Sequence, residues 1–250
     1  MSELPAEFAI ATEDRGRVRI LTFDRPEKLN SFTPVGYASL TEALATATAD
    51  NGVAVCVLTG RGRAFSSGVD LSVMGQPGGA AELGRHFDPM LEQLARFPKP
   101  LIAAVNGLAF GLGATILLHC DLVVVDEGAE IRMPFVSLGT SAEAASSWLL
   151  PRRVGMQQAS WMILSGGGLN ASEAVANGFA FAAAAPGQAL DEALVLAEQI
   201  ATHKTTALMV NKRLIRQDWA EAIERAWSRE RAAMLELAEQ VGPMGWKAGG

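Results

Sequence analysis

The sequence predicts an α/β fold in a single globular unit, with parallel strands joined by crossover helices. Strand-like and helix-like segments alternate through residues 8–169, at the interval that βαβ connections require. The segment after residue 170 reads almost wholly as helix. With 250 residues, of which 49% are hydrophobic and 19% charged, the chain is long enough to bury a large core.

The N-terminal part predicts a hairpin followed by a helix. Residues 8–12 and 17–23 alternate between apolar and polar side chains on either side of Asp14-Arg15-Gly16, a pattern typical of two paired strands. Thr33-Pro34 supplies a favourable N-cap and first helical residue, which predicts a helix that runs to about Asp50.

The middle of the chain supplies the buried strands. The apolar run VAVCVLTG at 53–60 predicts a strand covered on both faces, and residues 81–97 have a helical pattern. Residues 101–118, LIAAVNGLAFGLGATILL, carry no charge and are long enough to raise the question of a membrane span. Because Asn106-Gly107 is a turn signal inside this run, we expect instead a buried strand, a tight turn and a buried helix, and no membrane segment. Two more strands are expected, at DLVVVD and near AEIRMPF.

The C-terminal third predicts helices. Asn170 and Glu173 have the spacing of a capping box, and residues 188–240 are helix-rich with an interruption near His203 to Thr206. We therefore expect a core over residues 1–187 and a helical region over 188–250, which is a natural place for subunit contacts.

Composition and motifs exclude several classes of function. The net charge of −6 is spread along the chain without a basic cluster, which argues against nucleic acid as a partner. The three histidines are isolated, so no metal site is expected. Two cysteines in apolar segments and an N-terminus without signal-peptide features predict a cytoplasmic protein. Gly111-Leu112-Gly113 resembles part of a dinucleotide fingerprint, but Ile116 stands where the third glycine is required.

Two glycine-rich loops predict a site that stabilises negative charge. They span residues 65–71 and 106–113, and each follows a buried strand. Glycine allows the backbone to approach a ligand, and a helix N-terminus offers unpaired amides. If the two strand ends lie together, one amide from each loop can bind the same oxygen atom, as in an oxyanion hole. Each loop also has a simpler interpretation: Asp70 caps the next segment, and Gly111 and Gly113 allow close packing of strand against helix.

Glu143 is the one charged residue in the segment GTSAEAASS, residues 139–147, and two interpretations of it are open. Thr140 and Glu143 have the S/T-x-x-E spacing of a helix capping box, which requires no catalytic role. The alternative is a general base placed beside an acidic carbon of a substrate.

Five segments between residues 8 and 240 carry the motifs of a known family. They are DRPEKLNSF, VLTGRGRAFSSGVDL, KPLIAAVNGLAFGLGATILLHCDLVVV, MPFVSLGTSAEAASSWLLPRRVG and LSGGGLNASEAVANGF. Together, and in this order, they resemble the crotonase superfamily, the enoyl-CoA hydratase/isomerase family. The resemblance implies the crotonase fold, a spiral of ββα units with a helical C-terminal region that forms trimers or dimers of trimers. It also implies an acyl-CoA substrate, with coenzyme A as part of the substrate and no separate cofactor.

The resemblance also implies roles for the two loops. The backbone amides of Val69 and Leu112 would form the oxyanion hole for the thioester oxygen. Arg25 and Lys28 would lie near the phosphates of coenzyme A, although a solvated turn is a simpler interpretation of both. The full set of positions that would contact coenzyme A or the acyl chain is Arg25, Lys28, Leu29, Ala64, Ser66, Asp70, Leu71, Ser72, Phe135 and Leu138.

The catalytic carboxylates separate the reactions of the family. Its hydratases use two glutamates to hold a water, and those positions here are Thr115 and Phe135, neither of which can act as a carboxylate base. Its Δ3,Δ2-enoyl-CoA isomerases carry one glutamate in a segment like LG-x-x-x-E, which Leu138 to Ser147 matches with Glu143 at the acid. Relatives that hydrolyse aryl-CoA halides have an aspartate there and a histidine in the preceding helix, where this chain has Glu92.

The resemblance therefore favours a Δ3,Δ2-enoyl-CoA isomerase. In this hypothesis Glu143 takes the C2 proton of a 3-enoyl thioester and returns it to C4, and apolar neighbours such as Phe135 and Trp148 raise its pKa. A hydratase in which Glu143 holds a water with hydroxyls such as Thr115 and Ser141 is the alternative. A catalytically silent acyl-CoA-binding protein, with Glu143 as a cap only, is a further one.

Overall fold

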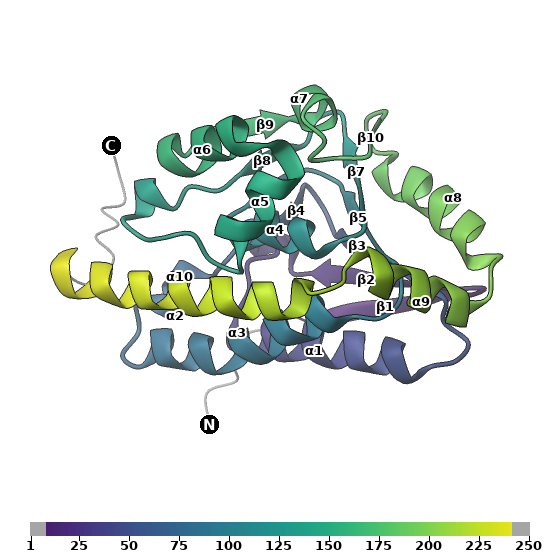
Figure 1. Cartoon of the computed structure of the whole chain (residues 1–250), viewed down its shortest axis with the longest axis horizontal. Coiled ribbons are helices and arrows are strands. Elements are labelled where there is room, and N and C mark those ends of the chain that lie inside the picture. The colour runs from purple at the N-terminus through teal and green to yellow at the C-terminus, as the bar shows by residue number, and fades with distance from the viewer. Residues whose placement is uncertain (1–8, 242–250) are drawn as a thin grey trace.

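The computed structural model describes residues 9–241, and two β-sheets lie at the centre of this part of the chain (Figure 1). The larger sheet has the strand order β1-β2-β3-β5-β7-β10, and the smaller has the order β4-β6-β8-β9. The strands of the larger sheet are β1 (Ala9–Arg15), β2 (Val18–Asp24), β3 (Val55–Gly60), β5 (Leu101–Val105), β7 (Leu122–Asp126) and β10 (Ala182–Ala184). Those of the smaller sheet are β4 (Ala64–Ser66), β6 (Leu108–Phe110), β8 (Glu130–Arg132) and β9 (Gly168–Asn170).

The strand pairings confirm the predicted hairpin and the α/β class. β1 and β2 are antiparallel around a turn in which Gly16 has a φ of 59°. The remaining neighbours in the larger sheet are parallel, as helical crossovers require. Phe8, which was expected in the first strand, lies outside the described residues.

The helices confirm most of the predicted caps. Thr33 caps the first long helix, since its Oγ1 accepts a hydrogen bond from Gly36 N at 3.2 Å, and Asn170 and Glu173 form the predicted capping box. The α-helices are α1 (Pro34–Ala49), α2 (Leu71–Met74), α3 (Gly79–Arg96), α4 (Leu112–Thr115), α5 (Ser146–Val154), α6 (Met156–Ser165), α7 (Ala171–Ala176), α8 (Ala189–Ala201), α9 (Thr205–Ile215) and α10 (Trp219–Val241). Three 3₁₀ helices accompany them: η1 (Pro26–Lys28), η2 (Ile116–His119) and η3 (Val136–Leu138).

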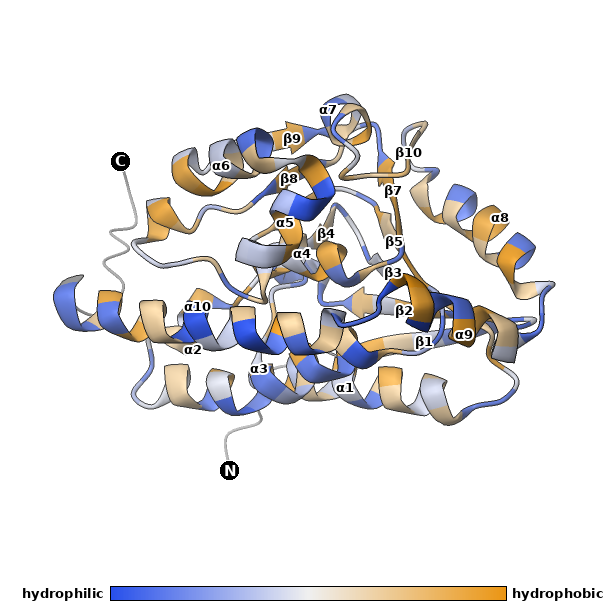
Figure 2. Ribbon diagram, in the orientation of Figure 1, coloured by the Kyte–Doolittle hydropathy of each residue, from blue (hydrophilic) through white to orange (hydrophobic). Residues whose placement is uncertain are grey.

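The larger sheet is covered on both faces, which explains its continuous apolar runs. In β3, Val55 and Val57 point to one face and belong to a cluster with the alanines of α8. Cys56 and Leu58 point to the other face and belong to the main core, to which α1 and α3 contribute. The hydropathy colouring shows these strands as predominantly hydrophobic segments between the helical layers (Figure 2). Side chains that alternate along a strand thus meet two different apolar layers.

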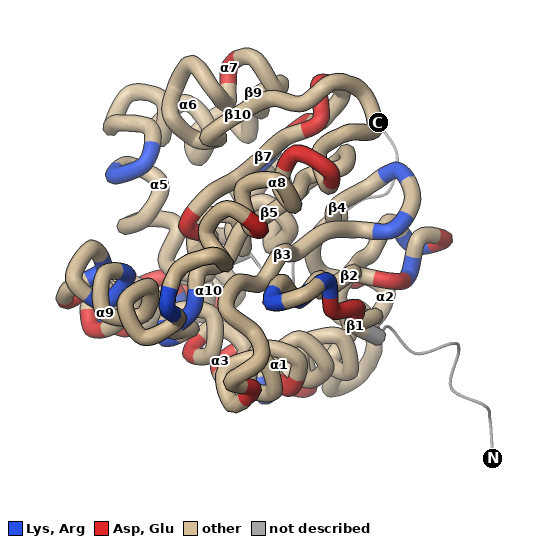
Figure 3. The backbone as a smooth tube through the Cα atoms, turned by 90° about the vertical axis from the view of Figure 1, so that its right-hand side faces the viewer, with Lys and Arg blue, Asp and Glu red and all other residues tan. Residues whose placement is uncertain are grey.

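The C-terminal region is helical, as expected, and breaks between α8 and α9 near His203. α8 packs on β3, β5 and β7, whereas α10 contacts α3 and α5. Basic and acidic residues are interspersed along α10, whereas the charged residues of α9 are Lys212 and Arg213 (Figure 3). Among the described residues, no helix is both long and apolar enough to cross a membrane. The expected division of the chain into a core and a helical region at residue 187 stays a prediction. Residues 1–8 of the core and 242–250 of the helical region lie outside the described residues.

Three strands of the smaller sheet, β4, β6 and β9, were not predicted, and neither was β10, which lies in a segment expected to be helical. β4 occupies the segment expected to be a glycine-rich loop, and β6 lies between the turn and the helix expected in residues 101–118. Each has only three residues, which is too short to show a period in the sequence. Of these strands, β4 and β6 place the candidate site.

Candidate active site

The smaller sheet brings the two glycine-rich loops together. β4 and β6 are neighbouring parallel strands, so the loops that follow them leave the same edge of the sheet. Gly68 in the first loop has a φ of +90°, and a Cβ there would lie 2.7 Å from Phe110 O and 3.1 Å from Leu112 N. The loops therefore touch through backbone atoms, at a position that only glycine can occupy without displacement.

The two amides predicted to form the oxyanion hole are free of hydrogen bonds to other described residues. The Val69 amide is free because the neighbouring groups make the local bridge: Phe32 N donates to Gly68 O, and Asp70 N donates to Phe32 O. Leu112 is the first residue of α4, whose opening amides have no partner within the helix. Both N–H groups are thus available to an acceptor brought by a ligand.

Ser66 and Leu29, both predicted to contact the ligand, support the first loop. Ser66 Oγ is buried, donates to Asn30 O at 2.8 Å and accepts from Gly68 N at 3.1 Å. Leu29 O accepts from Ser67 N at 2.9 Å. The Leu29-Asn30 turn, with both residues left-handed at φ 52° and 55°, thereby fixes the backbone next to Val69.

Arg25 and Asp70 form an ion pair at the base of the same loop. Arg25 Nη1 lies 2.7 Å from Asp70 Oδ2, and the two side chains are only 11% and 10% exposed. Asp70 also caps α2 by accepting from Ser72 N at 3.0 Å, which confirms the capping interpretation. Burial alone would raise the pKa of Asp70, but the hydrogen bonds from Ser72 and Arg25 hold it below its ordinary value. The expected contacts of these residues with coenzyme A stay predictions.

The remaining residues that were predicted to contact the ligand differ in their solvent exposure. Lys28 on η1 and Leu71 and Ser72 on α2 are exposed, so they are accessible to a ligand. Ala64 and Phe135 are buried, and Leu138 is half-buried at the end of η3.

Glu143 does not form a capping box with Thr140, which was one of its two interpretations. The helix that follows, α5, begins at Ser146 with Ala145 at its N-cap, so Thr140 lies too far upstream to cap it. Glu143 Oε1 instead accepts a hydrogen bond from Thr115 Oγ1 at 2.7 Å. The residue as a whole is half-buried, so part of it is accessible to a ligand. The capping interpretation is wrong because the backbone between Glu143 and Ser146 turns instead of continuing as helix.

The pKa of Glu143 is raised from 4.5 to about 8. Burial of the carboxyl is the main cause, because protein replaces the water that would solvate the charge. The hydrogen bond from Thr115 acts in the opposite direction, and the charge of Glu230 raises the pKa further. The rise has the direction predicted for this carboxyl.

Thr115 links Glu143 to the second loop. It lies on α4 three residues after Leu112, and its Oγ1 is 3.2 Å from Leu112 O as well as 2.7 Å from Glu143 Oε1. A hydroxyl has one proton and can donate only one of these bonds at a time. Thr115 therefore donates to Glu143 when that carboxylate is ionised. When Glu143 is protonated, its own O–H can donate to Thr115 Oγ1, and the Thr115 hydroxyl can then donate to Leu112 O.

Two residues that contact the Glu143 segment were not identified from the sequence patterns. Glu230 on α10 accepts hydrogen bonds from Ala145 N and Ser147 N, and His119 lies against Ala144 O. Glu230 could have been found, because it falls on the buried stripe of α10 marked by Ala222, Ile223 and Ala226. An acid on an apolar stripe needs a partner elsewhere in the fold.

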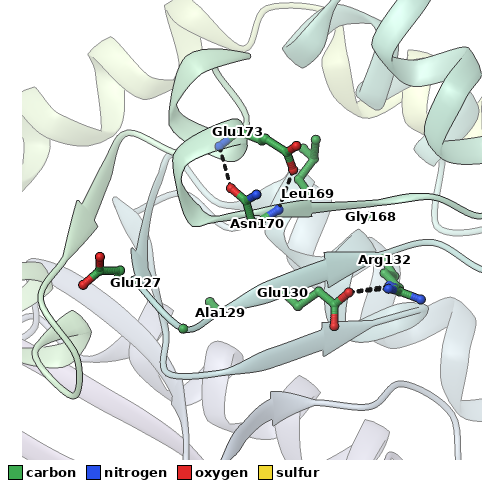
Figure 4. Close-up of a pocket in the computed structure, with 9 residues that line it drawn as sticks. Glu127, Ala129, Glu130, Arg132, Gly168, Leu169, Asn170 and Glu173 are labelled. Carbon is green, nitrogen blue, oxygen red and sulfur yellow. Dashed lines mark hydrogen bonds and ion pairs between the residues drawn. The ribbon is translucent and has the colours of Figure 1, made fainter.

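A surface pocket elsewhere does not belong to this site. It lies between β8, β9 and α7 (Figure 4). Of its charged side chains, Arg132 donates from Nε to Glu130 Oε1, and Glu173 belongs to the capping box with Asn170. None of the predicted site residues lines it. In the described part of the chain, no cluster of three or more His, Cys, Asp or Glu side chains could hold a metal ion.

Comparison with known proteins gives a consistent result. Residues 13–241 match the family described as enoyl-CoA hydratase/isomerase. The chain is 36% identical over 222 residues to the 2,3-dehydroadipyl-CoA hydratase of Escherichia coli, covering 89% of this chain and 87% of that protein. It is 37% identical over 215 residues to the 1,2-epoxyphenylacetyl-CoA isomerase of the same organism, covering 84% and 82%. A crystal structure of an enoyl-CoA hydratase/isomerase from Pseudoalteromonas atlantica is similar with a TM-score of 0.86 and 33% identity, covering 92% of this chain and 91% of that one.

Proposed function

The chain belongs to the enoyl-CoA hydratase/isomerase family, and on this basis we propose that it moves the double bond of a 3-enoyl-CoA to the 2 position. One observation carries the choice of reaction. Glu143, at the edge of the two-loop site, is hydrogen-bonded to Thr115, the residue that occupies one hydratase carboxylate position. The other such position is Phe135, which is 3% exposed and has no ionisable group. A single carboxylate suits a reaction in which one group both removes and returns a proton.

The proposed reaction is a proton transfer from C2 to C4. The ionised Glu143 takes a proton from C2, and the electrons of that C–H bond pass through C1 to the thioester oxygen, giving a dienolate. The amides of Val69 and Leu112 donate to that oxygen as its charge develops, and one such donor is worth about 3 kcal/mol of barrier. Protonated Glu143 then delivers the proton to C4, and a double bond forms between C2 and C3. No electrons are gained or lost overall, so the proposal calls for no redox cofactor.

The environment of Glu143 supports this role. A base whose pKa is about 8 binds the abstracted proton more strongly than an ordinary carboxylate does, and it remains partly ionised near neutral pH. Because C2 is bonded to the carbonyl carbon, the base must lie close to the amides that hold the thioester oxygen. Thr115 supports such proximity, since it connects Glu143 to the helix that begins at Leu112.

Hydration of a 2-enoyl-CoA is the second candidate function. The hydroxyl of Thr115 and the carboxyl of Glu143, 2.7 Å apart, are a pair of polar groups that could position a water. The similarity to the E. coli hydratase also favours this candidate. It ranks second because activation of water and protonation of C2 would both depend on Glu143. A catalytically silent acyl-CoA-binding protein is the remaining alternative.

An assay with two substrates separates the candidates. Purified protein is incubated with a 3-enoyl-CoA and, separately, with a 2-enoyl-CoA, and the products are identified by mass and absorbance. We expect a product of unchanged mass with a 2-enoyl chromophore from the first substrate. A gain of one water by the second substrate, with no reaction of the first, would establish the hydratase instead. Binding of either substrate without reaction would indicate the silent binder.

Thr115→Val is expected to shift the inflection in the pH profile of kcat/KM to higher pH. Glu143 must be ionised to act, so kcat/KM should rise with pH and level off above about pH 8. Thr115 stabilises the ionised form, and a hydrogen bond to a charged group contributes about 1.5 to 3 kcal/mol, or roughly one to two pKa units. Valine has a similar shape and no hydroxyl, so the inflection should move to higher pH. An unchanged inflection would show that another group limits the reaction.

The assembly and the compartment stay parts of the proposal. Exposed apolar side chains on α6 are suited to contacts between copies in a trimer or a dimer of trimers, and they include Met156, Trp161 and Leu164. Both cysteines, Cys56 and Cys120, are free and buried, as in proteins of a reducing compartment such as the cytoplasm.

A further inference from the structure

The turn that follows Glu143 has an unfavourable backbone conformation. Ala144 and Ala145 are both left-handed, with φ of 54° and 60°, and Ser146 N donates to Glu143 O at 2.9 Å across them. A residue with a Cβ is disfavoured in this region, so two in succession require support from the surrounding structure. The direction of the Glu143 side chain depends on the groups that provide this support.

Glu230 supports the turn from one side. Its Oε2 accepts from Ala145 N at 2.7 Å and its Oε1 accepts from Ser147 N at 2.8 Å, and the residue is 4% exposed. Ala145 is the N-cap of α5 and its own side chain cannot cap. Glu230 therefore supplies the cap of α5 from a different helix, with a negative charge at the positive end of the helix dipole.

His119 supports the same turn from the other side. Its Nε2 lies 3.0 Å from Ala144 O, and because a carbonyl oxygen can only accept, Nε2 carries the proton. Burial lowers the pKa of His119 to about 4, so the ring is neutral near pH 7. Nδ1 is then an acceptor, and it has no partner among the described residues.

The two contacts hold a single peptide plane. Ala144 O and Ala145 N belong to the same peptide group, which is planar and trans, so the carbonyl and the N–H point in opposite directions. His119 Nε2 donates to the carbonyl of Ala144, and Glu230 Oε2 accepts from the N–H of Ala145. A rotation of this plane to a less strained conformation would break both hydrogen bonds at once.

α10 delivers Glu230 from a fixed position. Asp88 on α3 accepts from Trp227 Nε1 at 2.9 Å and from Arg231 Nη1 at 2.8 Å, so α10 is anchored on both sides of Glu230. Ser141 Oγ lies 3.2 Å from Glu230 O and 3.1 Å from Ala142 O and can donate to either, so the residues just before Glu143 also lie against the same helix. The C-terminal helix thus contacts the Glu143 segment on both sides of Glu143.

We propose that Glu230 and His119 are positioning residues that lock the peptide between Ala144 and Ala145 and thereby aim Glu143 at the reacting carbon. The proposal rests on the role of Glu143 as base, and it adds the C-terminal helix to the parts of the molecule that the reaction needs.

Substitutions of Glu230 test this proposal. Glu230→Ala is expected to lower kcat for the 3-enoyl-CoA by about 10-fold to 100-fold, while the Kd for a saturated acyl-CoA changes less than threefold, because the residues predicted to contact coenzyme A lie on other elements. Glu230→Gln keeps the volume and one acceptor oxygen, so its loss should be smaller. Glu224→Ala, an exposed glutamate on the same helix, is the matched control and should leave kcat unchanged. His119→Gln keeps an N–H donor and should retain more activity than His119→Ala.

A double variant separates positioning from a general structural role. In a Glu143→Gln background there is no base to aim, so adding Glu230→Ala should cause no further loss of the residual rate. An equal loss in both backgrounds, or a Kd that rises in step with the fall in kcat, would overturn the proposal. If Glu230→Ala does not fold, Glu230→Gln is judged by the same criteria.

Proton exchange distinguishes a failure of this proposal from a failure of the isomerase assignment. Wild-type protein with a saturated acyl-CoA in D₂O should exchange the C2 protons, because this step needs only the base and the two amides. If exchange occurs without isomerisation, the isomerase assignment fails and the Glu230 variants are compared by exchange rate. If wild type shows neither reaction, Glu143 is not a base and the positioning proposal fails with it.

Discussion

Glu143→Gln is expected to lower kcat about a thousandfold and, at the same time, to stabilise the protein at alkaline pH. A general base contributes roughly 10²-fold to 10⁴-fold to a rate, and glutamine cannot accept the C2 proton. The amide is close in shape to a protonated glutamate, so the Kd for an acyl-CoA should change little. The loss should appear in kcat, measured with a 3-enoyl-CoA at pH 8.

The stability gain follows from the raised pKa of Glu143. Its pKa is about 8 in the folded protein and 4.5 as the ordinary value, so between these pH values the folded state holds a proton that the unfolded chain has released. Wild-type stability therefore falls as pH rises through this window and reaches its lower level above pH 8. Glutamine does not ionise, so the variant should gain on the order of 2 kcal/mol above pH 8, allowing for partial exposure, and little at pH 4.

Urea unfolding at pH 4 and pH 9, beside kcat, checks both effects. Glu173→Gln is a suitable control because Glu173 lies in a real capping box, on α7, outside the candidate site. It should keep wild-type kcat and show no gain at pH 9. A Glu143→Gln protein that remained active, or that was less stable than wild type at both pH values, would restore a purely structural role for this residue.

Gly68→Ala is expected to lower kcat/KM at least a hundredfold. The added Cβ would lie 2.7 Å from Phe110 O and 3.1 Å from Leu112 N, and the backbone there has a φ of +90°. Relief of these contacts must separate the loops, and with them the amides of Val69 and Leu112. Loss of one oxyanion donor costs roughly 10²-fold to 10³-fold, so displacement of both should be at least as damaging.

Gly78→Ala separates the steric effect from backbone strain. Gly78 has a φ of +79°, close to that of Gly68, but a Cβ there would meet no atom within 4 Å. Both alanine variants should lose about 1 kcal/mol of stability from the left-handed backbone, whereas only Gly68→Ala should lose activity. Unfolding midpoints and kcat/KM, measured side by side, give the comparison. If the two variants had similar kcat/KM values, the close contact of the two loops would not be needed for catalysis.

Local patterns were sufficient for the larger elements. The alternation on either side of Gly16, the Thr33-Pro34 cap and the Asn170 capping box report interactions within a few residues of each other, and each element appears as predicted. The continuous apolar run of β3 predicted a strand covered on both faces, as found. Such features depend on neighbours along the chain, so the sequence displays them directly.

Identification of the candidate site required both the sequence motifs and the tertiary structure. The family motifs pointed to Val69, Leu112 and Glu143 from the sequence alone, and tertiary structure was needed to place the two loops in contact through Gly68. The capping interpretation of Thr140 and Glu143 failed because S/T-x-x-E spacing describes a helix start, and here two left-handed alanines delay that start to Ser146.

The sequence by itself determined the fold class, the family and the identity of one candidate base. Only the tertiary structure decided that Thr115 is hydrogen-bonded to Glu143 and that Glu230, 87 residues further along the chain, caps the turn beside it. The physical reason is that a hydrogen bond between distant segments leaves no period or spacing in either segment. It forms only when the packing of α4, α5 and α10 brings the partners within 3 Å of each other.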